Sequence, residues 1–189
     1  MEVRVKNLCK AYGGQTVLQN VTFTAGAGIT CVMAPSGRGK TTLLRILLGL
    51  EQADSGSVET SGALRWAAVF QEDRLLEHVD ALENLRFVLG AEFRETQAAE
   101  LLQELGLGDV GQKKVRDFSG GMKRRLALAR ALLSPADALV LDEPFTGLDE
   151  ENRAEAIACI RRRTAGKLVL LVTHEETDAA GLDAAVLRI

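Results

Sequence analysis

Residues 34–42 have the spacing of a loop that wraps around phosphate groups. They read Ala-Pro-Ser-Gly-Arg-Gly-Lys-Thr-Thr and lie between a strand-like apolar run, 29–33, and a helix-like one, 43–50. Glycines let a backbone approach phosphates closely, and the N–H groups that open a helix point toward an anion. The stretch therefore predicts a nucleotide site at a strand-to-helix turn, with an ordinary glycine-rich turn as the alternative.

Every residue of this phosphate loop is a candidate for binding the nucleotide. The candidates are Ala34, Pro35, Ser36, Gly37, Arg38, Gly39, Lys40, Thr41 and Thr42. Lys40 is expected to reach the β- and γ-phosphates, and Thr41 to place its hydroxyl on Mg²⁺. Ala34 stands where the motif usually has glycine, and it would strain the loop if its φ angle were positive.

Polar residues also follow three further strand-like runs, at 63–70, 138–141 and 168–172. They are Gln71, Asp142 with Glu143, and Thr173 with His174. Because ligands bind at the carboxyl ends of parallel strands, we expect these groups to converge on the phosphate loop. Asp142 would hold Mg²⁺ through its water shell, Glu143 would polarise the attacking water, and His174 would stabilise charge on the γ-phosphate during in-line transfer. Alternatively, each residue taken singly is a helix cap or a turn former.

The elements that must position these residues are predicted from hydrophobic periodicity. Short strands are expected at 3–8 and 17–24, in an antiparallel sheet, and at 57–60, 63–70, 138–141, 168–172 and 185–189. Helical periodicity at about 72–118 predicts an insertion of helices, in which Asp80 and Glu83 resemble a capping box. Further helices are expected from Ser119 to about Leu133 and over 150–164. The fold class is therefore α/β, in a single domain that spans 1–189.

Some residues have two interpretations at this stage. Tyr12, the only tyrosine, precedes the phosphate loop on a turn, where it would either stack on a base or be an ordinary core or surface residue. Lys123, Arg124 and Arg125 occupy the first turns of a predicted helix, where cations oppose the helix dipole. They indicate either a nearby anion or a solvated basic face. The arginines at 161–163 are interpreted as a solvated face.

Composition limits the class of protein. A chain of 189 residues with 47% hydrophobic residues and a net charge of −3 is typical of one large domain and has no basic excess that would favour nucleic acid. No apolar run approaches the roughly 20 residues of a membrane span, and the first residues are not a secretion signal. Three widely spaced cysteines favour buried thiols in a reducing compartment. We therefore expect a cytosolic chain that binds no nucleic acid.

Several motifs, in this order along the chain, resemble those of the nucleotide-binding subunits of ABC (ATP-binding cassette) proteins, and the resemblance covers essentially the whole chain. Tyr12 is similar to the family's adenine-stacking aromatic, Gln71 to its Q-loop glutamine, and His174 to its switch histidine. Residues 118–122 (Phe-Ser-Gly-Gly-Met, here the signature segment) resemble the family's Leu-Ser-Gly-Gly-Gln. Residues 139–143 resemble its Walker B strand, and 146–149 (Thr-Gly-Leu-Asp) the loop that follows.

The resemblance implies a P-loop NTPase core with a mainly parallel sheet, an N-terminal antiparallel β subdomain and an inserted helical subdomain. It implies ATP and Mg²⁺ as cofactors, Lys40 and Gln71 among the catalytic residues, and Gln71 also at the metal. It further implies that two cassettes pack head to tail, so that the signature segment of one meets the nucleotide on the other. The residues that would act there are Ser119, Gly120, Gly121 and Asp149. Met122 replaces the signature glutamine and cannot make its hydrogen bonds, which would weaken that contact.

The resulting hypothesis is an ATPase subunit that powers an ABC transporter from the inner face of the cell membrane. Its implied partners are integral membrane subunits, which would dock on the helical insertion with Gln71 as a hinge, and a second nucleotide-binding subunit, identical or different. Residues 69–76 resemble cassettes of nitrate, sulfonate and taurine importers, which implies an extracytoplasmic substrate-binding protein. The chain stops soon after His174, so we expect no C-terminal regulatory domain. The alternatives are a soluble ABC ATPase of repair, translation or iron–sulfur assembly, and a module that senses ATP without hydrolysing it.

Overall fold

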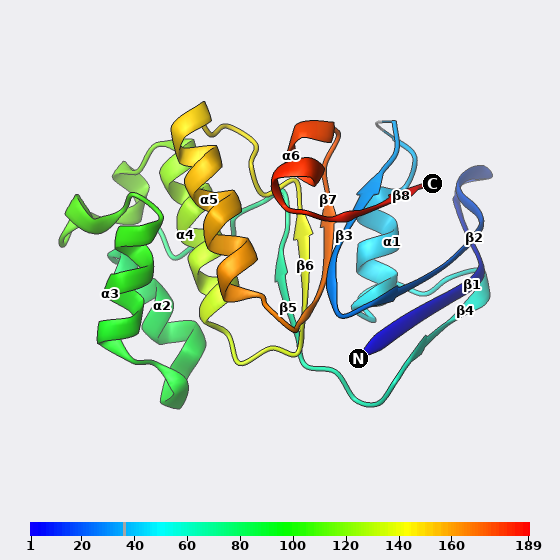
Figure 1. The fold of residues 1–189 in the computed structure, drawn as a ribbon, viewed down its shortest axis with the longest axis horizontal. Helices are drawn as coiled ribbons and strands as arrows, with labels where there is room; N and C mark the ends of the chain where they lie inside the picture. The colour runs from blue at the N-terminus through cyan, green and yellow to red at the C-terminus, as the bar shows by residue number, and fades with distance from the viewer. Residues whose placement is uncertain (36) are drawn as a thin grey trace.

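A computed structural model describes residues 1–35 and 37–189, in which two β-sheets flank a helix (Figure 1). The smaller sheet is antiparallel, with strand order β2-β1-β4, and consists of β1 (Glu2–Tyr12), β2 (Gln15–Gly26) and β4 (Ser55–Thr60). Val3 and Val5 of β1 are buried because alternate side chains of a strand point to the same face, and Leu8 is buried beyond a shift of register between Val5 and Leu8. The antiparallel sheet that the sequence predicts is confirmed.

The larger sheet is parallel at every pairing and has the order β5-β6-β7-β3-β8. Its strands are β3 (Gly28–Met33), β5 (Trp66–Val69), β6 (Ala138–Asp142), β7 (Leu168–Val172) and β8 (Ala185–Arg188). All residues of β6 and β7 are buried, as expected of strands that are covered on both faces. The carboxyl ends of β3, β5, β6 and β7 therefore meet at one edge, which confirms the parallel core.

The helices are α1 (Lys40–Leu47), α2 (Ala81–Leu89), α3 (Glu95–Glu104), α4 (Gly120–Leu133), α5 (Glu150–Arg163) and α6 (Glu176–Gly181). Helix α1 lies between the two sheets, and α4 and α5 cover the opposite face of the parallel sheet (Figure 1). Successive side chains of β6 point to opposite faces of the sheet and so contribute to two separate cores. Ala138 and Val140 share a core with α1 and the antiparallel sheet, whereas Leu139 and Leu141 share one with α4 and α5.

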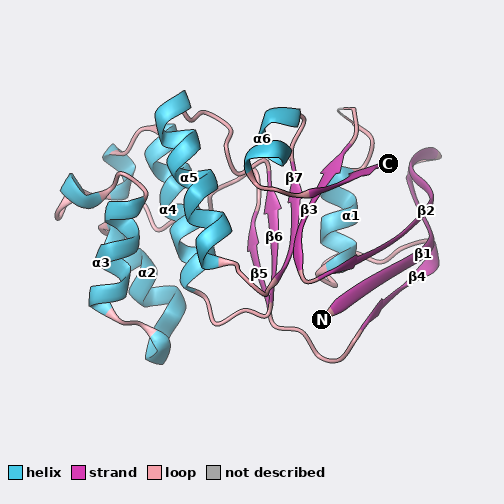
Figure 2. Cartoon of the chain, in the orientation of Figure 1, coloured by secondary structure: helices cyan, strands magenta, loops and turns pink. Residues whose placement is uncertain are grey.

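Helices α2 and α3 lie at the end of the molecule away from the antiparallel sheet (Figure 2), in the stretch predicted to be a helical insertion. A short 3₁₀ helix, η1 (Gly90–Glu92), lies between them, and two more, η2 (Gly108–Val110) and η3 (Val115–Asp117), follow α3. Asp80 caps α2 by accepting a hydrogen bond from the Glu83 amide at 2.9 Å, as its spacing predicts. Among the described residues, no helix has the length and hydrophobicity needed to cross a bilayer.

The contact between α3 and α5 corrects one sequence interpretation. Arg163 at the end of α5 is only 29% exposed and donates to Glu104 of α3 at 2.7 Å, and Arg162 donates to the same carboxylate at 2.6 Å. The interpretation of 161–163 as a solvated face holds for Arg161 and Arg162, which are exposed, but not for Arg163. Arg162 and Arg163 together join the helical insertion to the core.

Candidate nucleotide site

The phosphate loop packs directly on β2. Gly39 precedes α1 with a left-handed φ of 75°. A Cβ atom there would lie 2.5 Å from the Val17 carbonyl oxygen and 2.8 Å from a Leu18 methyl carbon. Only glycine satisfies both the angle and the space. Ala34 has no positive φ, so the strain that its replacement of glycine could have caused does not arise.

Lys40 is folded back over the loop and is 8% exposed. Its ammonium donates to the carbonyl oxygens of Ala34 at 2.7 Å and Pro35 at 3.2 Å. The Arg38 amide also donates to the Pro35 oxygen, at 3.3 Å, which closes a turn inside the loop. Ser36, another predicted binding residue, lies outside the described residues. The Lys40 ammonium therefore lies against the backbone of the loop, close to the Ala34 and Pro35 carbonyl oxygens.

Asp142, the last residue of β6, meets the loop through Thr41. The Thr41 hydroxyl donates to one Asp142 carboxylate oxygen at 2.7 Å. The other oxygen is buried and has no hydrogen-bond partner within the described part of the chain. Burial raises the pKa of Asp142, and the Thr41 hydrogen bond opposes that shift. An unpaired carboxylate oxygen beside a hydroxyl is a donor set that suits a hard cation such as Mg²⁺.

Among the described residues, no cluster of three His, Cys, Asp or Glu side chains could hold a metal alone. Mg²⁺ does not require such a cluster, because it keeps several waters and binds through few protein ligands together with phosphate oxygens. The Thr41 and Asp142 pair therefore fits Mg²⁺ better than it fits a metal that needs a full protein cage.

Gln71 and Glu143 lie on the same cavity as the phosphate loop. This cavity has a volume of about 270 Å³ and is lined by Val17, Gly37, Gly39, Lys40, Thr41, Thr42, Gln71 and Glu143. His174 lines a neighbouring cavity together with Glu143, and its Nδ1 atom lies 3.9 Å from a Glu143 carboxylate oxygen. The structure therefore brings together the residues that follow β5, β6 and β7, as their positions at strand ends predict.

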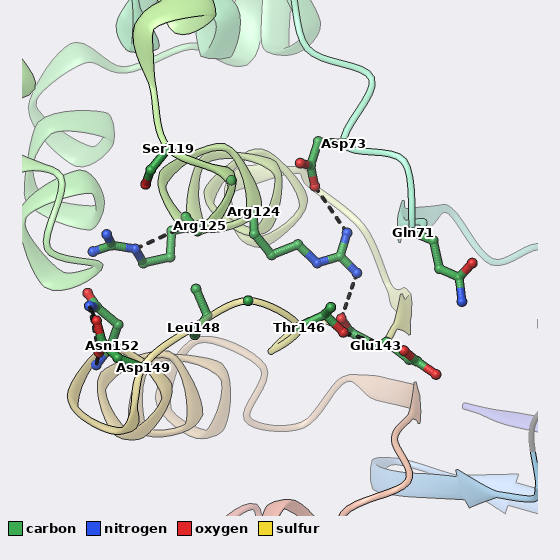
Figure 3. A pocket seen from close by; sticks show the side chains of 13 residues that line it. Gln71, Asp73, Ser119, Arg124, Arg125, Glu143, Thr146, Leu148, Asp149 and Asn152 are labelled. Atoms are coloured by element: carbon green, nitrogen blue, oxygen red, sulfur yellow. Dashed lines mark hydrogen bonds and ion pairs between the residues drawn. The ribbon is translucent and has the colours of Figure 1, made fainter.

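The signature segment lies on a different and larger cavity, of about 770 Å³ (Figure 3). Ser119, Gly120, Gly121 and Asp149 line it, together with Gln71 and Glu143, which the two cavities share. A Cβ atom on Gly121 would lie 3.0 Å from the Gly147 carbonyl oxygen, so the signature segment packs closely on the loop 146–149. Among the described residues, none of the signature segment lines the cavity of the phosphate loop.

Two predicted binding residues, Asp149 and Tyr12, interact with residues close to them in the sequence. Asp149 caps α5, since its carboxylate accepts from the Asn152 amide at 2.9 Å, a bond that also lowers its pKa. Tyr12 ends β1 with 46% of its surface exposed, and the Lys10 ammonium lies 5.3 Å from its ring centre. The core alternative for Tyr12 is therefore wrong. Tyr12 does not line the phosphate-loop cavity, although Val17 of the adjoining strand does.

The basic residues of α4 have partners that the sequence did not indicate. Arg124 and Arg125 are only 4% and 8% exposed. Arg125 donates to the Leu105 carbonyl at 2.8 Å, and Lys123 to the Glu77 carboxylate at 2.8 Å. Arg124 donates to Asp73 at 3.1 Å. A solvated face is thus wrong for both arginines, and the anions beside Lys123 and Arg124 are carboxylates of the chain itself. A cation opposing a helix dipole signals such a partner without identifying it.

Comparison with known proteins places this geometry in a family. A family profile described as "ABC transporter" matches residues 18–146. The aliphatic sulfonates import ATP-binding protein 1 of Rhodococcus jostii is 42% identical over 185 residues, which cover 94% of this chain and 75% of that protein. The tungstate uptake system ATP-binding protein of Peptoclostridium acidaminophilum is 38% identical, over 96% of this chain and 91% of that protein.

A solved structure supports the fold. The structure of a bacterial Atm1-family ABC exporter with ATP bound superposes with a TM-score of 0.86 at 20% identity, over 100% of this chain and 37% of the exporter chain. The chain thus corresponds in fold to about a third of that exporter chain and spans about three quarters of its relative from Rhodococcus jostii. On its sequence matches, the chain belongs to the ABC transporter family and is one of that family's ATP-binding subunits.

Proposed function

We propose that this chain hydrolyses Mg²⁺-bound ATP at the phosphate loop and so powers import of a small oxyanion by an ABC transporter. The observation that carries the hydrolytic part is the 270 Å³ cavity, in which Lys40 and Thr41 of the loop face Gln71 and Glu143. The substrate class is supported by two relatives. One is an aliphatic sulfonates import ATP-binding protein, and the other is a tungstate uptake system ATP-binding protein. Both names denote oxygen-rich anions.

The residues around this cavity have separate roles in the proposed reaction. Lys40 and the loop amides bind the phosphates, with Pro35, Ser36, Gly37, Arg38, Gly39 and Thr42 shaping the loop. Thr41, Asp142 and Gln71 hold Mg²⁺, which neutralises charge on the phosphate oxygens when it is bound. Glu143 polarises the attacking water, and His174, 3.9 Å from it, stabilises charge on the transferring phosphate. Tyr12 stacks on the adenine.

A second nucleotide-binding subunit is part of this proposal. Ser119, Gly120, Gly121 and Asp149 line a cavity apart from the phosphate loop of their own chain. As the resemblance to ABC proteins implies, a site that uses both sets of residues would be shared by two chains arranged head to tail. Two identical chains would form two equivalent sites, because a twofold axis repeats every contact.

The docking surface for the membrane subunits is proposed on the helical insertion. Phe87 and Val88 of α2 are 73% and 54% exposed, and nearby in sequence Leu76 is 41% exposed. Exposed apolar side chains of this size favour an apolar partner, here a short helix of a membrane subunit. Docking there would hold the chain at the inner face of the membrane, in a complex that also includes an extracytoplasmic substrate-binding protein.

Affinity purification of the tagged chain from detergent-solubilised membranes tests the proposal. We expect a stoichiometric polytopic membrane protein to co-purify with the wild type and with Leu50→Ser, and much less of it with Phe87→Ser. Leu50 is the matched control, because it is 57% exposed and lies outside the helical insertion. If only soluble proteins co-purified, the transporter proposal would fail in favour of a soluble ABC ATPase. Equal recovery with Phe87→Ser would reject the docking surface alone.

A further inference from the structure

Arg124 joins the segments that carry Gln71 and Glu143. It lies in the second turn of α4, its side chain is 5% exposed, and its guanidinium faces oxygens on two sides (Figure 3). On one side it donates to the Phe70 carbonyl and, at 3.1 Å, to the Asp73 carboxylate. On the other side it donates to the carbonyls of Asp142 and, at 2.7 Å, Glu143.

We propose that Arg124 is a positioning residue for ATP hydrolysis, which holds Glu143 and Gln71 in a fixed relation at the edge of the sheet. The inference rests on the proposed role of Glu143 in polarising water. Phe70 and Asp73 bracket Gln71 in the sequence, so one side of the guanidinium fixes the segment that carries Gln71. The other side fixes the end of β6 and the backbone of Glu143 itself.

The backbone of Glu143 requires such support. Its φ is +48°, in the left-handed region that non-glycine residues seldom adopt and that persists only when the surroundings enforce it. The Glu143 amide donates to the Val172 carbonyl at 3.0 Å, and its carbonyl accepts from Arg124. Both peptide groups that flank its Cα atom are thus held by hydrogen bonds, which sets the direction in which the carboxylate leaves the backbone.

An arginine suits this position for a geometric reason. A guanidinium presents five donors in a rigid plane, whereas a lysine ammonium has three donors on a flexible stem. Arg124 uses its two terminal nitrogens on four oxygens, while its buried Nε has no partner among the described residues. An apolar side chain in place of Arg124 would remove the donor from the Asp73 carboxylate and from the carbonyls of Phe70, Asp142 and Glu143, so Arg124 also contributes to stability. The positioning role is distinguished by kcat, which a purely stabilising residue would not change in the folded protein.

The position of Arg124 also relates the signature segment to Glu143. Ser119 caps helix α4, since its hydroxyl accepts from the Met122 amide at 3.2 Å, and Arg124 lies in the second turn of that same helix. A displacement of the signature segment along α4 would therefore reach the backbone of Glu143 and the segment of Gln71 through a single side chain.

Steady-state kinetics of the purified complex test this inference with Arg124→Met and Arg124→Lys. For Arg124→Met we expect kcat to fall at least tenfold while KM and the affinity for a fluorescent ATP analogue change less than twofold. Arg124→Lys should recover part of kcat, since its ammonium can reach some of the same oxygens. Arg163→Met is the matched control: it removes another carboxylate-bonded arginine, 29% exposed, from outside the site, so it should lower the melting temperature and leave kcat unchanged.

The outcomes separate this inference from the proposed function. A wild type without ATP hydrolysis would reject the proposed function. An active wild type with unchanged kcat in both Arg124 variants would reject the positioning role alone. A loss of kcat that only followed the loss of folded protein, as measured by circular dichroism, would also reject it. If Arg124→Met does not fold, the kcat of Arg124→Lys decides, and the inference fails if that value equals the wild-type value.

Discussion

Gly39 is held between two constraints that a single methyl group would violate. Its φ is 75°, and a Cβ atom would approach the Val17 oxygen to 2.5 Å. We expect Gly39→Ala to lower the free energy of unfolding by about 2–4 kcal/mol, through backbone strain together with overpacking. Urea unfolding at pH 7 measures the change.

Gly37 is the matched control for this prediction. Its φ is 79°, but among the described residues nothing lies within 4 Å of the position that a Cβ would take. Gly37→Ala should therefore lose only the strain component, about 1–2 kcal/mol. Equal losses in the two variants would show that the contact with β2 does not set the requirement for glycine at position 39.

Among single residues, the sequence predicted those polar side chains that lie next to a motif or at the end of an apolar run. Gln71, Asp142 and Glu143 immediately follow apolar runs of the sequence, so their meeting at one edge could be inferred from the expected parallel order. The partners of Arg124 could not, because they are largely backbone carbonyls, which every residue carries. The close approach of Gly39 to β2 was also unpredictable, since it depends on how two distant segments pack.

At the element scale, Glu104 joins α3 of the helical insertion to α5 of the core. The Arg163 hydrogen bond, followed by that of Arg162, lowers the pKa of Glu104 from 4.5 to about 2. A lowered carboxyl pKa contributes stability that is fully present above pH 4.5 and is lost as the pH falls toward 2. We expect Glu104→Gln to cost about 1–2 kcal/mol at pH 7, between the values of exposed and buried ion pairs.

Unfolding by urea at pH 7, 5 and 3 measures this effect. The difference between wild type and Glu104→Gln should be equal at pH 7 and 5 and smaller at pH 3, where the unfolded carboxyl is protonated. Glu95→Gln is the control, because Glu95 is 66% exposed in its pair with Arg86 and should change stability by under about 0.5 kcal/mol. A Glu104→Gln difference that did not shrink at pH 3 would contradict the assigned cause.

The strands were predictable as elements, and so was the antiparallel pairing of β1 with β2, but the partners of β4 and β5 were not. β4 and β5 are both short and follow one another along the chain, yet β4 joins the antiparallel sheet and β5 the parallel one. Their separation depends on pairing with β1 and β6, which are distant in sequence, so local periodicity could not determine it. The long apolar runs of β6 and β7, by contrast, predicted buried strands directly.

At the scale of the whole molecule, the two cavities that share Gln71 and Glu143 are the main feature. One contains the phosphate loop and the other the signature segment. Sequence motifs predicted both sets of residues, and the resemblance to ABC proteins predicted that they meet across two chains. The motifs of this chain do not identify the proposed substrate, because other chains would bind it. They do not identify the proposed membrane subunits either, because the surface that would contact them has no fixed sequence pattern.

Phosphate release at saturating Mg²⁺-ATP, compared between wild type and Glu143→Gln in the purified complex, tests whether Glu143 drives ATP hydrolysis. Glutamine preserves the shape of the side chain but cannot polarise water as a carboxylate does, so we expect the rate to fall at least about a hundredfold. ATP should still bind, and it should hold two cassettes together because turnover no longer separates them. A Glu143→Gln complex that released phosphate at the wild-type rate would contradict the claim that this site hydrolyses ATP through Glu143.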